Sequence, residues 1–370
     1  MKDKICIITT VHAPLDIRIF QKEAKALVQE GYDVSLIAQH ERDEIVGGVK
    51  IIAIPKSQNR FTRFFELTWK AFYNAFRQKA DVYHFHDPEL IPCGVLLKIL
   101  NKSKVVYDVH EDLPKQILTK YWIPTGLRKL VACCSQLTEA MGAFFFDRIV
   151  AATPKIAERF PTGKTVVVQN YPRLDELVME NTIPYSQRPP YVVYVGGISR
   201  PRGIEEMVRA VGLLPEELKV RLVLAGSFSP IALEKELLQR PEWERVEFLG
   251  WQTREKVATI LANSRIGLVV FHPVPNHINA QPNKLFEYMS SKIPVIASDF
   301  PLWRDIVVKT GCGLLVDPLK PEEIAQAIQW LLENPDEAQA MGERGREAVQ
   351  SQYNWSIEEK KLLQMYKELL

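Results

Sequence analysis

Short apolar runs and helix-like segments alternate along the chain. The first run, KICIITT at 4–10, is continuous, as in a buried strand, and residues 16–38 then read as a helix that stops at Gly31 and a second strand. Further strand-like runs, with helical sequence between them, lie at 49–55, 81–87, 104–112, 148–153 and 165–172. Such alternation predicts a parallel sheet covered by helices on both faces.

The alternation breaks at residues 173–190, which are polar and rich in proline, and restarts at 191–214 with a strand, a glycine loop and a helix. Later strands are predicted at 220–227, 246–251, 265–271, 293–298 and 311–317. We therefore predict two doubly wound Rossmann-like domains facing each other across a cleft. Their predicted boundaries are 1–172 for the N-terminal domain, 173–190 for a linker, 191–352 for the C-terminal domain and 353–370 for a last helix, with the N-terminal domain as one place for it to pack.

The composition is that of a globular protein. The chain has 370 residues, enough for two domains, and is 46% hydrophobic and 25% charged. No apolar run approaches the roughly 20 residues of a membrane-spanning helix, and the first residues do not resemble a signal peptide. The five cysteines show no metal-binding or disulfide spacing and are expected to be reduced packing residues. We expect a cytoplasmic protein.

The charge is unevenly distributed. Residues 1–173 carry 25 Lys and Arg against 18 Asp and Glu, a balance of +7, while the remaining residues carry 22 against 27, a balance of −5. The N-terminal domain is therefore the one expected to meet an anionic surface.

An aromatic stripe with helical spacing lies in the positive half. It consists of Phe61, Phe64, Phe65, Thr68, Trp69, Phe72, Tyr73 and Phe76. Most of this stripe is expected to pack in the core. Its other side carries Arg63, Lys70 and Arg77, and residues 115–130 add further cations and aromatics. This pattern favours docking on anionic lipid at the inner face of the membrane, and no motif favours nucleic acid.

A glycine pair follows the first strand of the C-terminal domain. In YVGGISRPRG (194–203), Gly196 and Gly197 come before Arg200 and Arg202, just ahead of a helix. Small residues allow the backbone to approach a phosphate, and arginine can clamp it, so this loop is either an anion site or a tight structural turn.

A polar break before another helix offers a second candidate. Pro282 pre-sets the first turn, Lys284 lies near its positive end, and Glu287 follows about one turn later. A phosphate at the helix start and a sugar hydroxyl on the carboxylate would use these groups. The simpler alternative is a capping turn with a solvent-facing Glu287.

Histidines and acids also cluster near predicted strand ends. His84 and His86 alternate onto one strand face, and Asp87, His110 and Asp112 follow strands nearby. The spacing is generic, so we expect no metal site there.

Several segments resemble the family 4 glycosyltransferases, which have the two-domain GT-B architecture. These segments are HAPLDIRIFQKEAKALVQEGYDVSLIA, HFHDPEL, VVYDVHEDLP, VVQNYP, YVGGISRPRGI, VEFLGW, PNKLFEYMSSKIPVIAS and GCGLLVDP, in the order of the family. The resemblance covers nearly the whole chain. It implies that the N-terminal domain lies on the acceptor side and that the C-terminal domain binds the donor nucleotide.

The resemblance assigns roles to single residues. Glu287 matches the second glutamate of the family's motif of two glutamates separated by seven residues, which holds the nucleotide ribose, and Arg202 matches the basic residue that grips the diphosphate. His110 matches the histidine that faces the donor sugar. The full expected donor set is Gly196, Gly197, Arg200, Arg202, Asn283, Lys284, Leu285 and Glu287.

His12, Asp16 and Arg18 resemble the family's cleft loop after the first strand, so the resemblance implies that they lie near the diphosphate or the acceptor.

The chain departs from the family pattern at two positions. The first motif glutamate is replaced by Asn279, and the usual arginine of the glycine loop falls on Gly197. An amide cannot supply the charge of a carboxylate nucleophile, although it can bind a sugar hydroxyl, and Asn279 is kept as a candidate catalytic residue. We hypothesise that Lys284, with Arg200 as a further candidate, replaces the missing arginine.

The sequence thus predicts a glycosyltransferase that moves a sugar from a nucleoside diphosphate sugar, with UDP-sugar favoured, to a carbohydrate or lipid-linked acceptor, with retention and without a metal cofactor. Two alternatives stay open. One is an epimerase of the same fold with Glu111 or Asp112 as acid and base. The other is a non-catalytic protein that binds sugar nucleotides, which the presence of Asn279 makes credible.

Overall fold

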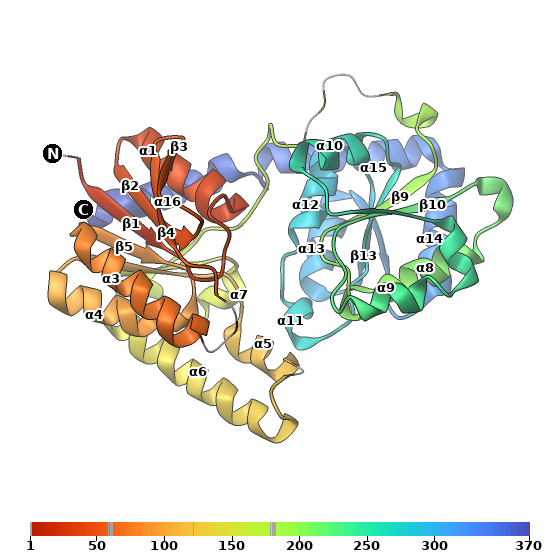
Figure 1. Ribbon diagram of the computed structural model, residues 1–370. Coiled ribbons are helices and arrows are strands. Elements are labelled where there is room, and N and C mark those ends of the chain that lie inside the picture. Colours follow the sequence, from red (N-terminus) through yellow and green to blue (C-terminus); the bar gives the residue numbers. More distant parts are fainter. Residues whose placement is uncertain (1, 58, 60–61, 121, 178, 180–182) are drawn as a thin grey trace. The chain divides into compact units, whose positions relative to one another are not determined.

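A computed structural model describes residues 2–57, 59, 62–120, 122–177, 179 and 183–370. The chain forms two compact α/β units, which we describe separately (Figure 1). The first unit consists of Met1–Asn170 together with Trp355–Leu370, and the second of Tyr171–Asn354. Residues 173–190, predicted as a linker, belong to the second unit, because Leu177 and Tyr185 are buried in its core.

The first unit contains an eight-stranded sheet. Its strands are β1 (Lys4–Ile8), β2 (Asp33–Gln39), β3 (Glu44–Val46), β4 (Val49–Ile54), β5 (Val82–Phe85), β6 (Lys104–Val109), β7 (Arg148–Ala151) and β8 (Thr165–Val167). The order is β3-β4-β2-β1-β5-β6-β7-β8, and every pair is parallel except β3 with β4. The sequence pattern missed β3, which is joined to β4 by a turn at Gly47 and Gly48, both at positive φ.

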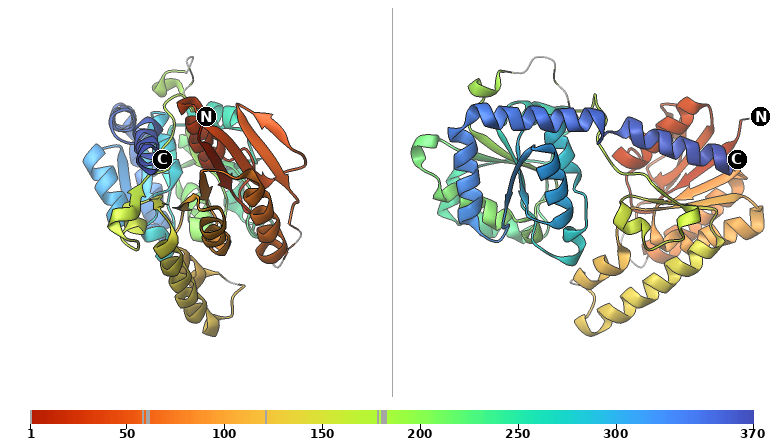
Figure 2. Two further views of the ribbon diagram at one scale, coloured as in Figure 1. Left: turned by 90° about the vertical axis from the view of Figure 1, so that its left-hand side faces the viewer. Right: turned by 180° about the vertical axis from the view of Figure 1, so that it is seen from behind.

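Helices cover both faces of this sheet. They are η1 (Ile17–Ala24), α1 (Lys25–Glu30), η2 (Arg63–Leu67), α3 (Thr68–Gln78), η3 (Pro88–Leu90), α4 (Ile91–Asn101), α5 (Leu113–Thr119), α6 (Thr125–Phe145), α7 (Pro154–Ala157), η4 (Thr162–Lys164) and α16 (Trp355–Leu369). One face packs on α3, α4 and the end of α6. The other packs on η1, α1 and α16, which Figure 2 shows in blue along the sheet in the right-hand view.

The second unit contains a six-stranded, fully parallel sheet. Its strands are β9 (Tyr191–Val195), β10 (Arg221–Ala225), β11 (Val246–Gly250), β12 (Ile266–Val269), β13 (Val295–Ser298) and β14 (Gly313–Val316). The order β11-β10-β9-β12-β13-β14 reverses between β9 and β12, as in a Rossmann fold. The prediction of two Rossmann-like α/β units is confirmed.

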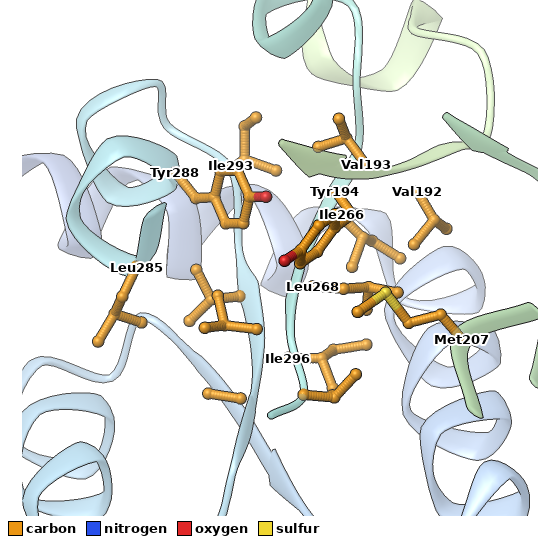
Figure 3. Close-up of a cluster of buried hydrophobic side chains, with 14 of the residues drawn as sticks. Val192, Val193, Tyr194, Met207, Ile266, Leu268, Leu285, Tyr288, Ile293 and Ile296 are labelled. Atoms are coloured by element: carbon orange, nitrogen blue, oxygen red, sulfur yellow. The ribbon is translucent and has the colours of Figure 1, made fainter. Parts of the chain in front are cut away.

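The helices of the second unit lie on both faces of its sheet (Figure 1). They are η5 (Tyr185–Gln187), η6 (Arg200–Arg202), α8 (Ile204–Leu213), η7 (Glu216–Leu218), α9 (Ala232–Leu237), η8 (Pro241–Arg245), α10 (Arg254–Ala262), α11 (Pro275–Ile278), α12 (Asn283–Ser290), α13 (Pro301–Thr310), α14 (Pro321–Glu333) and α15 (Pro335–Ser351). Figure 3 shows part of the core, in which Tyr194 of β9 and Tyr288 of α12 lie among aliphatic side chains.

Among the described residues, no helix is both long enough and apolar enough to cross a membrane.

Candidate active site

The glycine loop of the second unit is tightly held at the carboxyl end of β9. Gly196 has φ of 119°, a conformation that favours glycine, and its N–H donates to Ala225 O at 2.8 Å. The Gly197 carbonyl accepts from the Tyr194 hydroxyl at 2.7 Å and from Arg202 Nη1 at 3.0 Å. A Cβ on Gly197 would lie 2.5 Å from Arg202 Nη1. The missing side chain at position 197 therefore makes room for Arg202 to fold onto the loop.

Lys284 lies beside this loop. It is buried, and its Nζ lies 4.9 Å from the ring centroid of Tyr194 and 4.8 Å from that of Phe271. Burial, together with the nearby charge of Arg202, lowers the pKa of Lys284 to about 7. Two aromatic rings lie next to its ammonium, which makes no hydrogen bond to another described residue, and the charge of Glu287 opposes the lowering of the pKa of Lys284. A Cβ on Gly196 would lie 3.5 Å from Nζ, so the two predicted donor residues are close neighbours.

Glu287 is held by an arginine that the sequence analysis did not identify. Arg254, at the start of α10, places Nη1 3.0 Å from Glu287 Oε1 and Nη2 2.7 Å from Glu176 Oε1. Burial lowers the pKa of Arg254, but the charges of Glu287 and Glu176 outweigh it and raise that pKa. The Glu287 side chain is 14% exposed, so it lies in a fixed orientation at the surface rather than pointing freely into solvent.

The other predicted residues of α12 have different surroundings. Asn283 is exposed at the first helical position. The Leu285 side chain is fully buried in the core, and its N–H donates to Pro282 O at 3.1 Å, so any contact of Leu285 with a donor would have to be indirect. Pro282 precedes the helix rather than forming its first turn.

Asn279 follows the short helix α11 and is half-buried. The same loop carries His277, whose ring lies 4.9 Å from that of Phe271. Burial, and the nearby charges of Arg202 and Lys284, lower the pKa of His277 to about 4 despite a hydrogen bond with the His272 carbonyl that raises it. The loop thus places a neutral histidine near the two candidate phosphate-binding cations.

Arg200 points toward acids instead. Its Nε lies 3.3 Å from Glu205 Oε1, and its guanidinium also pairs with Glu236. The charge of Arg200 is therefore already matched by acids on the surface.

In the first unit, His110 lies at the carboxyl end of β6. Its Nε2 lies 3.0 Å from His86 Nδ1 and 3.4 Å from Asp108 Oδ1, and its side chain is 19% exposed. Burial, together with the charges of Arg18 and His12, lowers the pKa of His110 to about 3, against an opposing effect of Asp108. His110 is therefore neutral at physiological pH and suited to hydrogen bonding rather than to carrying charge.

His12 lies next to His110, with ring centroids 5.1 Å apart. Its Nδ1 is 3.6 Å from Asp16 Oδ2, and its Nε2 is 3.7 Å from Asp87 Oδ1. Burial lowers the pKa of His12, but the hydrogen bond to Asp16 and the charge of Asp87 outweigh it, so the pKa is raised.

Asp16 has a structural task in addition. Its Oδ1 accepts from the N–H groups of Arg18 at 2.8 Å and Ile19 at 3.0 Å and so caps η1. Burial raises the pKa of Asp16, but the hydrogen bonds from His12 and Ile19 lower it to about 2. Asp16 is thus a permanent carboxylate that orients His12.

The structure corrects the expectation for Arg18. This side chain is only 4% exposed and lies inside the first unit, with Nη2 2.9 Å from Asp108 Oδ2 and Nε 2.9 Å from Glu23 Oε1. Its Nη1 donates to Val168 O at 3.0 Å. Arg18 therefore neutralises buried acids and does not present its charge to a ligand.

The same buried cluster contains the group of side chains, among those described, that could hold a metal ion: Glu23, His84, His86 and Asp108. Arg18 already supplies a cation to both carboxylates, and a divalent ion beside it would be repelled. Burial and the charge of Asp108 also raise the pKa of Glu23 well above its usual range. We therefore assign this cluster no metal.

Four side chains around Lys284 and Glu287 were not predicted from the sequence: Arg254, Tyr194, Phe271 and His277. Arg254 is 33 residues from Glu287 and belongs to no local pattern. The aromatic pair around Lys284 reads in the sequence as ordinary strand residues. Only the position of His277, two residues before Asn279, could have indicated a role.

The chain matches two family descriptions. Residues 175–348 match the family described as Glycosyl transferases group 1, and residues 18–176 match the family described as Glycosyltransferase Family 4. Together these matches cover most of both units.

Curated relatives are distant. The chain is 25% identical to an alpha-D-kanosaminyltransferase of Streptomyces kanamyceticus over 49% of this chain and 46% of that protein. It is 21% identical to an uncharacterised glycosyltransferase of Methanocaldococcus jannaschii over 93% of this chain and 92% of that protein. It is also 25% identical to the D-inositol 3-phosphate glycosyltransferase of Corynebacterium urealyticum over 60% of this chain and 51% of that protein. The matches to the first and third span about half the length of each relative.

Solved structures share the fold. Sucrose-phosphate synthase from Thermosynechococcus elongatus superposes with a TM-score of 0.80 at 20% identity, covering 100% of this chain and 99% of that chain. HepE of Anabaena, solved with UDP, gives a TM-score of 0.73 at 14% identity, covering 100% of both chains. WaaG, a glycosyltransferase of lipopolysaccharide biosynthesis, gives 0.73 at 16% identity, covering 98% of this chain and 99% of that chain. The chain is therefore a glycosyltransferase of the family 4 type, with the GT-B fold.

Proposed function

We propose that the protein transfers a sugar from a UDP-sugar, bound by the second unit, to a carbohydrate or lipid-linked acceptor in the synthesis of a cell-surface polysaccharide or glycoconjugate, with retention of the anomeric configuration. The observation that carries this proposal is the position of Lys284, a residue only 9% exposed whose Nζ lies beside the glycine loop and next to two aromatic rings, without an ion pair to any described acid. A buried cation is costly unless an anion joins it, and a diphosphate supplies that charge.

The donor fits the groups around Lys284. The diphosphate lies against Gly196 and Gly197, between Lys284 and Arg202, at the positive start of α12. Arg254 occupies Glu287 Oε1 and so leaves the other carboxylate oxygen for the ribose hydroxyls. HepE of Anabaena has been solved with UDP and with UDP-glucose, which supports uridine as the base.

The chemistry follows from charge stabilisation rather than from an enzyme nucleophile. The bond between the anomeric carbon and the diphosphate oxygen breaks as the acceptor oxygen bonds to the same face of that carbon. The acceptor hydroxyl proton passes to the leaving diphosphate, and Lys284 and Arg202 stabilise its growing negative charge. Asn279 binds a sugar hydroxyl, and neutral His110 offers a further hydrogen bond to the transferred sugar. No step requires a metal, and we expect transfer to survive treatment with EDTA.

Of the two alternatives, the epimerase gains no support from the first unit. Asp112 caps α5 and lies 2.8 Å from Lys115 Nζ and 3.4 Å from Arg159 Nη1, so its charge is matched. Glu111 is exposed and contacts Gln116. The only observation in favour of the non-catalytic alternative is the presence of Asn279 in place of the family's glutamate.

The decisive test compares turnover in three proteins: wild type, Lys284→Met and Asn279→Glu. Lys284→Met keeps the apolar stem and removes the charge, and we expect it to reduce release of UDP from the donor about 100-fold or more. Wild type should turn over without a carboxylate at position 279. Donor binding with no turnover in wild type, and none gained in Asn279→Glu, would support the binding role instead.

A further inference from the structure

Three helices form an outer layer on one face of the first unit's sheet: α3, α4 and α6, drawn in orange to yellow in Figure 1. Their inner sides are narrow. In the 21-residue helix α6 only Ala132, Glu139, Gly142 and Ala143 are buried. In α3 the buried residues are Ala71, Phe72 and Ala75. Most of the surface of this layer therefore faces outward.

The outward surface is apolar over all three helices. Its exposed large side chains are Phe64, Phe65, Trp69, Tyr73, Phe76, Leu96, Ile99, Leu100, Leu127, Leu130, Val131, Leu137, Met141, Phe144 and Phe145. We call this set the α3–α4–α6 face. Most side chains of the aromatic stripe that was predicted for the core are thus exposed, because α3 packs on the sheet through Ala71, Phe72 and Ala75. Phe61, the first residue of that stripe, is not among the described residues. Single exposed apolar residues are ordinary, but a contiguous patch of this extent marks an interaction site.

The stripe on α6 is continuous along the helix. Leu127, Leu130, Leu137, Met141 and Phe144 follow the spacing of three and four residues that puts side chains on one side. This side differs from the buried one. Phe144 is 77% exposed and Leu137 and Met141 are 61% exposed, so the stripe is not covered by another part of the described chain.

The charge around this face is positive. Residues 63–79, 91–102 and 125–145 carry eight Lys and Arg against two acids, Glu66 and Glu139. Glu139 is buried and pairs with Arg159, while Glu66 pairs with Lys70 at 2.5 Å. Arg63 and Lys98 pair with acids outside these ranges, Glu89 at 3.0 Å and Asp147 at 2.6 Å. Among the described residues, the exposed cations of this layer that have no acidic partner are Arg77, Lys79, Lys102 and Lys129.

Aromatic residues lie next to these cations. Arg77 Cζ is 5.6 Å from the Tyr73 ring centroid, and Arg63 Cζ is 5.1 Å from that of Phe64. Exposed Trp and Tyr beside Lys and Arg are typical of residues that lie at the boundary between lipid headgroups and acyl chains.

We propose that the α3–α4–α6 face docks on an anionic phospholipid surface. The broad apolar surface enters the headgroup region, and the cations bind the lipid phosphates. A second copy of the chain fits less well. A helix pair through α6 would leave α3 and α4 uncovered. One flank of its stripe, formed by Gly126, Lys129, Cys133, Gln136 and Ala140, carries a single positive charge and no acid with which a second copy could pair.

Docking would place the acceptor side of the enzyme against lipid-linked acceptors. That consequence rests on the proposed function, whereas the docking itself does not. It can therefore be tested without donor or acceptor, and donor binding can be tested without vesicles.

The test is flotation of the full chain with vesicles of phosphatidylcholine alone or with about 30% phosphatidylglycerol. We expect wild type to float with the anionic vesicles, to float at least tenfold less with the neutral ones, and to dissociate in 0.5 M salt, an illustrative value of about three times physiological ionic strength. The triple variant Trp69→Ser, Leu137→Ser and Met141→Ser should lose flotation. The matched control, Ile231→Ser, Trp251→Ser and Val308→Ser, removes side chains that are 74%, 74% and 68% exposed in the second unit and should float as wild type does.

A label on the helix adds a local readout. Cys133 and Cys134 are the exposed cysteines, and only Cys134 lies within the stripe of α6. An environment-sensitive dye on Cys134 in Cys133→Ser should shift to the blue with anionic vesicles, and the same dye on Cys133 in Cys134→Ser should shift less. Flotation of the triple variant at the wild-type level, or no flotation of wild type, would overturn the proposal. A wild-type dimer that becomes a monomer in the triple variant, without vesicle binding, would show that the face joins two copies.

Discussion

Arg254 Nη1 lies 3.0 Å from Glu287 Oε1, and this contact fixes the carboxylate to which we assign the ribose of the donor. The arginine is itself held by Glu176, 2.7 Å from Nη2, so the three side chains form a chain of charges within the second unit. A glutamate at a helix surface would otherwise sample several rotamers. The carboxylate that we propose as the ribose ligand is thus already oriented by Arg254.

We predict that Arg254→Leu weakens donor binding about tenfold, because Glu287 loses its orientation and a charged hydrogen bond. Isothermal titration with UDP measures this change. Arg240→Leu is the matched control, since Arg240 pairs with Glu205 in the same unit and should bind UDP as wild type does.

Tighter rather than weaker binding by Arg254→Leu would contradict this account of the Arg254–Glu287 pair. Tighter binding of UDP by Arg254→Leu would mean that Arg254 competes with the ribose for Glu287 and must be displaced by the donor.

The pKa of Lys284, about 7, predicts a pH dependence of donor binding. The pKa of the free enzyme's ammonium is lowered, so its protonated fraction falls above pH 7, whereas a bound diphosphate favours the protonated form. The affinity for UDP should therefore be highest below pH 7 and fall by up to about tenfold per pH unit above it.

Lys284→Arg tests the cause of that decline. Arginine stays charged throughout this range, so the variant should show a flat affinity between pH 7 and 9, whatever its absolute affinity. An equally steep decline in the variant would assign the pH dependence to another group.

The second unit was more predictable from sequence than the first. Lys284 and Glu287 follow a proline, which predicts a helix start. The structure has α12 begin directly after that proline, with both residues in its first turns. Arg254 and Glu176 complete the arrangement from distant parts of the chain, and no local pattern links residues that meet only through the fold. The core position of Leu285 follows from α12 packing on the sheet, which spacing alone does not resolve.

In the first unit, position after a strand was a poor guide to exposure. His12 and Arg18 both follow β1. The His12 side chain is partly exposed, whereas Arg18 is buried with Asp108 and Glu23. The local sequence around Arg18 does not indicate that these acids lie beside it. The prediction that the aromatic stripe of α3 packs in the core was wrong in the opposite direction, because most of its side chains are exposed. Its periodicity predicts a covered face, but it cannot say whether protein or another surface covers it.

The two neighbouring histidines should titrate differently. The pKa of His12 is raised by Asp16 and Asp87, whereas that of His110 is lowered to about 3, mainly by burial. NMR of the histidine rings between pH 5 and 8 should show His12 gaining a proton with a midpoint above 6.5, and His110 staying neutral. The signal lost in His12→Asn assigns the titrating ring, and titration of His110 within this range would refute the assignment.

Arg18 should matter for stability rather than for catalysis. Arg18→Met leaves the buried carboxylate of Asp108 without its cation and removes the partner of Glu23, and we expect it to destabilise the first unit by about 3–5 kcal/mol. Hydrogen exchange of amides in β1 and β5 reports on this unit separately from the other.

The control for Arg18 is Arg42→Met, because Arg42 is 81% exposed and lies 4.0 Å from Glu44. That change should alter the stability by no more than about 0.5 kcal/mol. If Arg18→Met were equally mild, the buried cluster would be held together by protonation rather than by the arginine.

The most direct test of the central claim is a panel of UDP-, GDP- and ADP-sugars, assayed by thermal shift and by slow hydrolysis to the nucleoside diphosphate. Wild type is compared with Glu287→Ala and with the control Glu216→Ala, whose carboxylate is 93% exposed. We predict that one UDP-sugar stabilises and is hydrolysed by wild type and Glu216→Ala, and that Glu287→Ala loses both responses. No stabilisation by any donor, or an unchanged response in Glu287→Ala, would contradict the account.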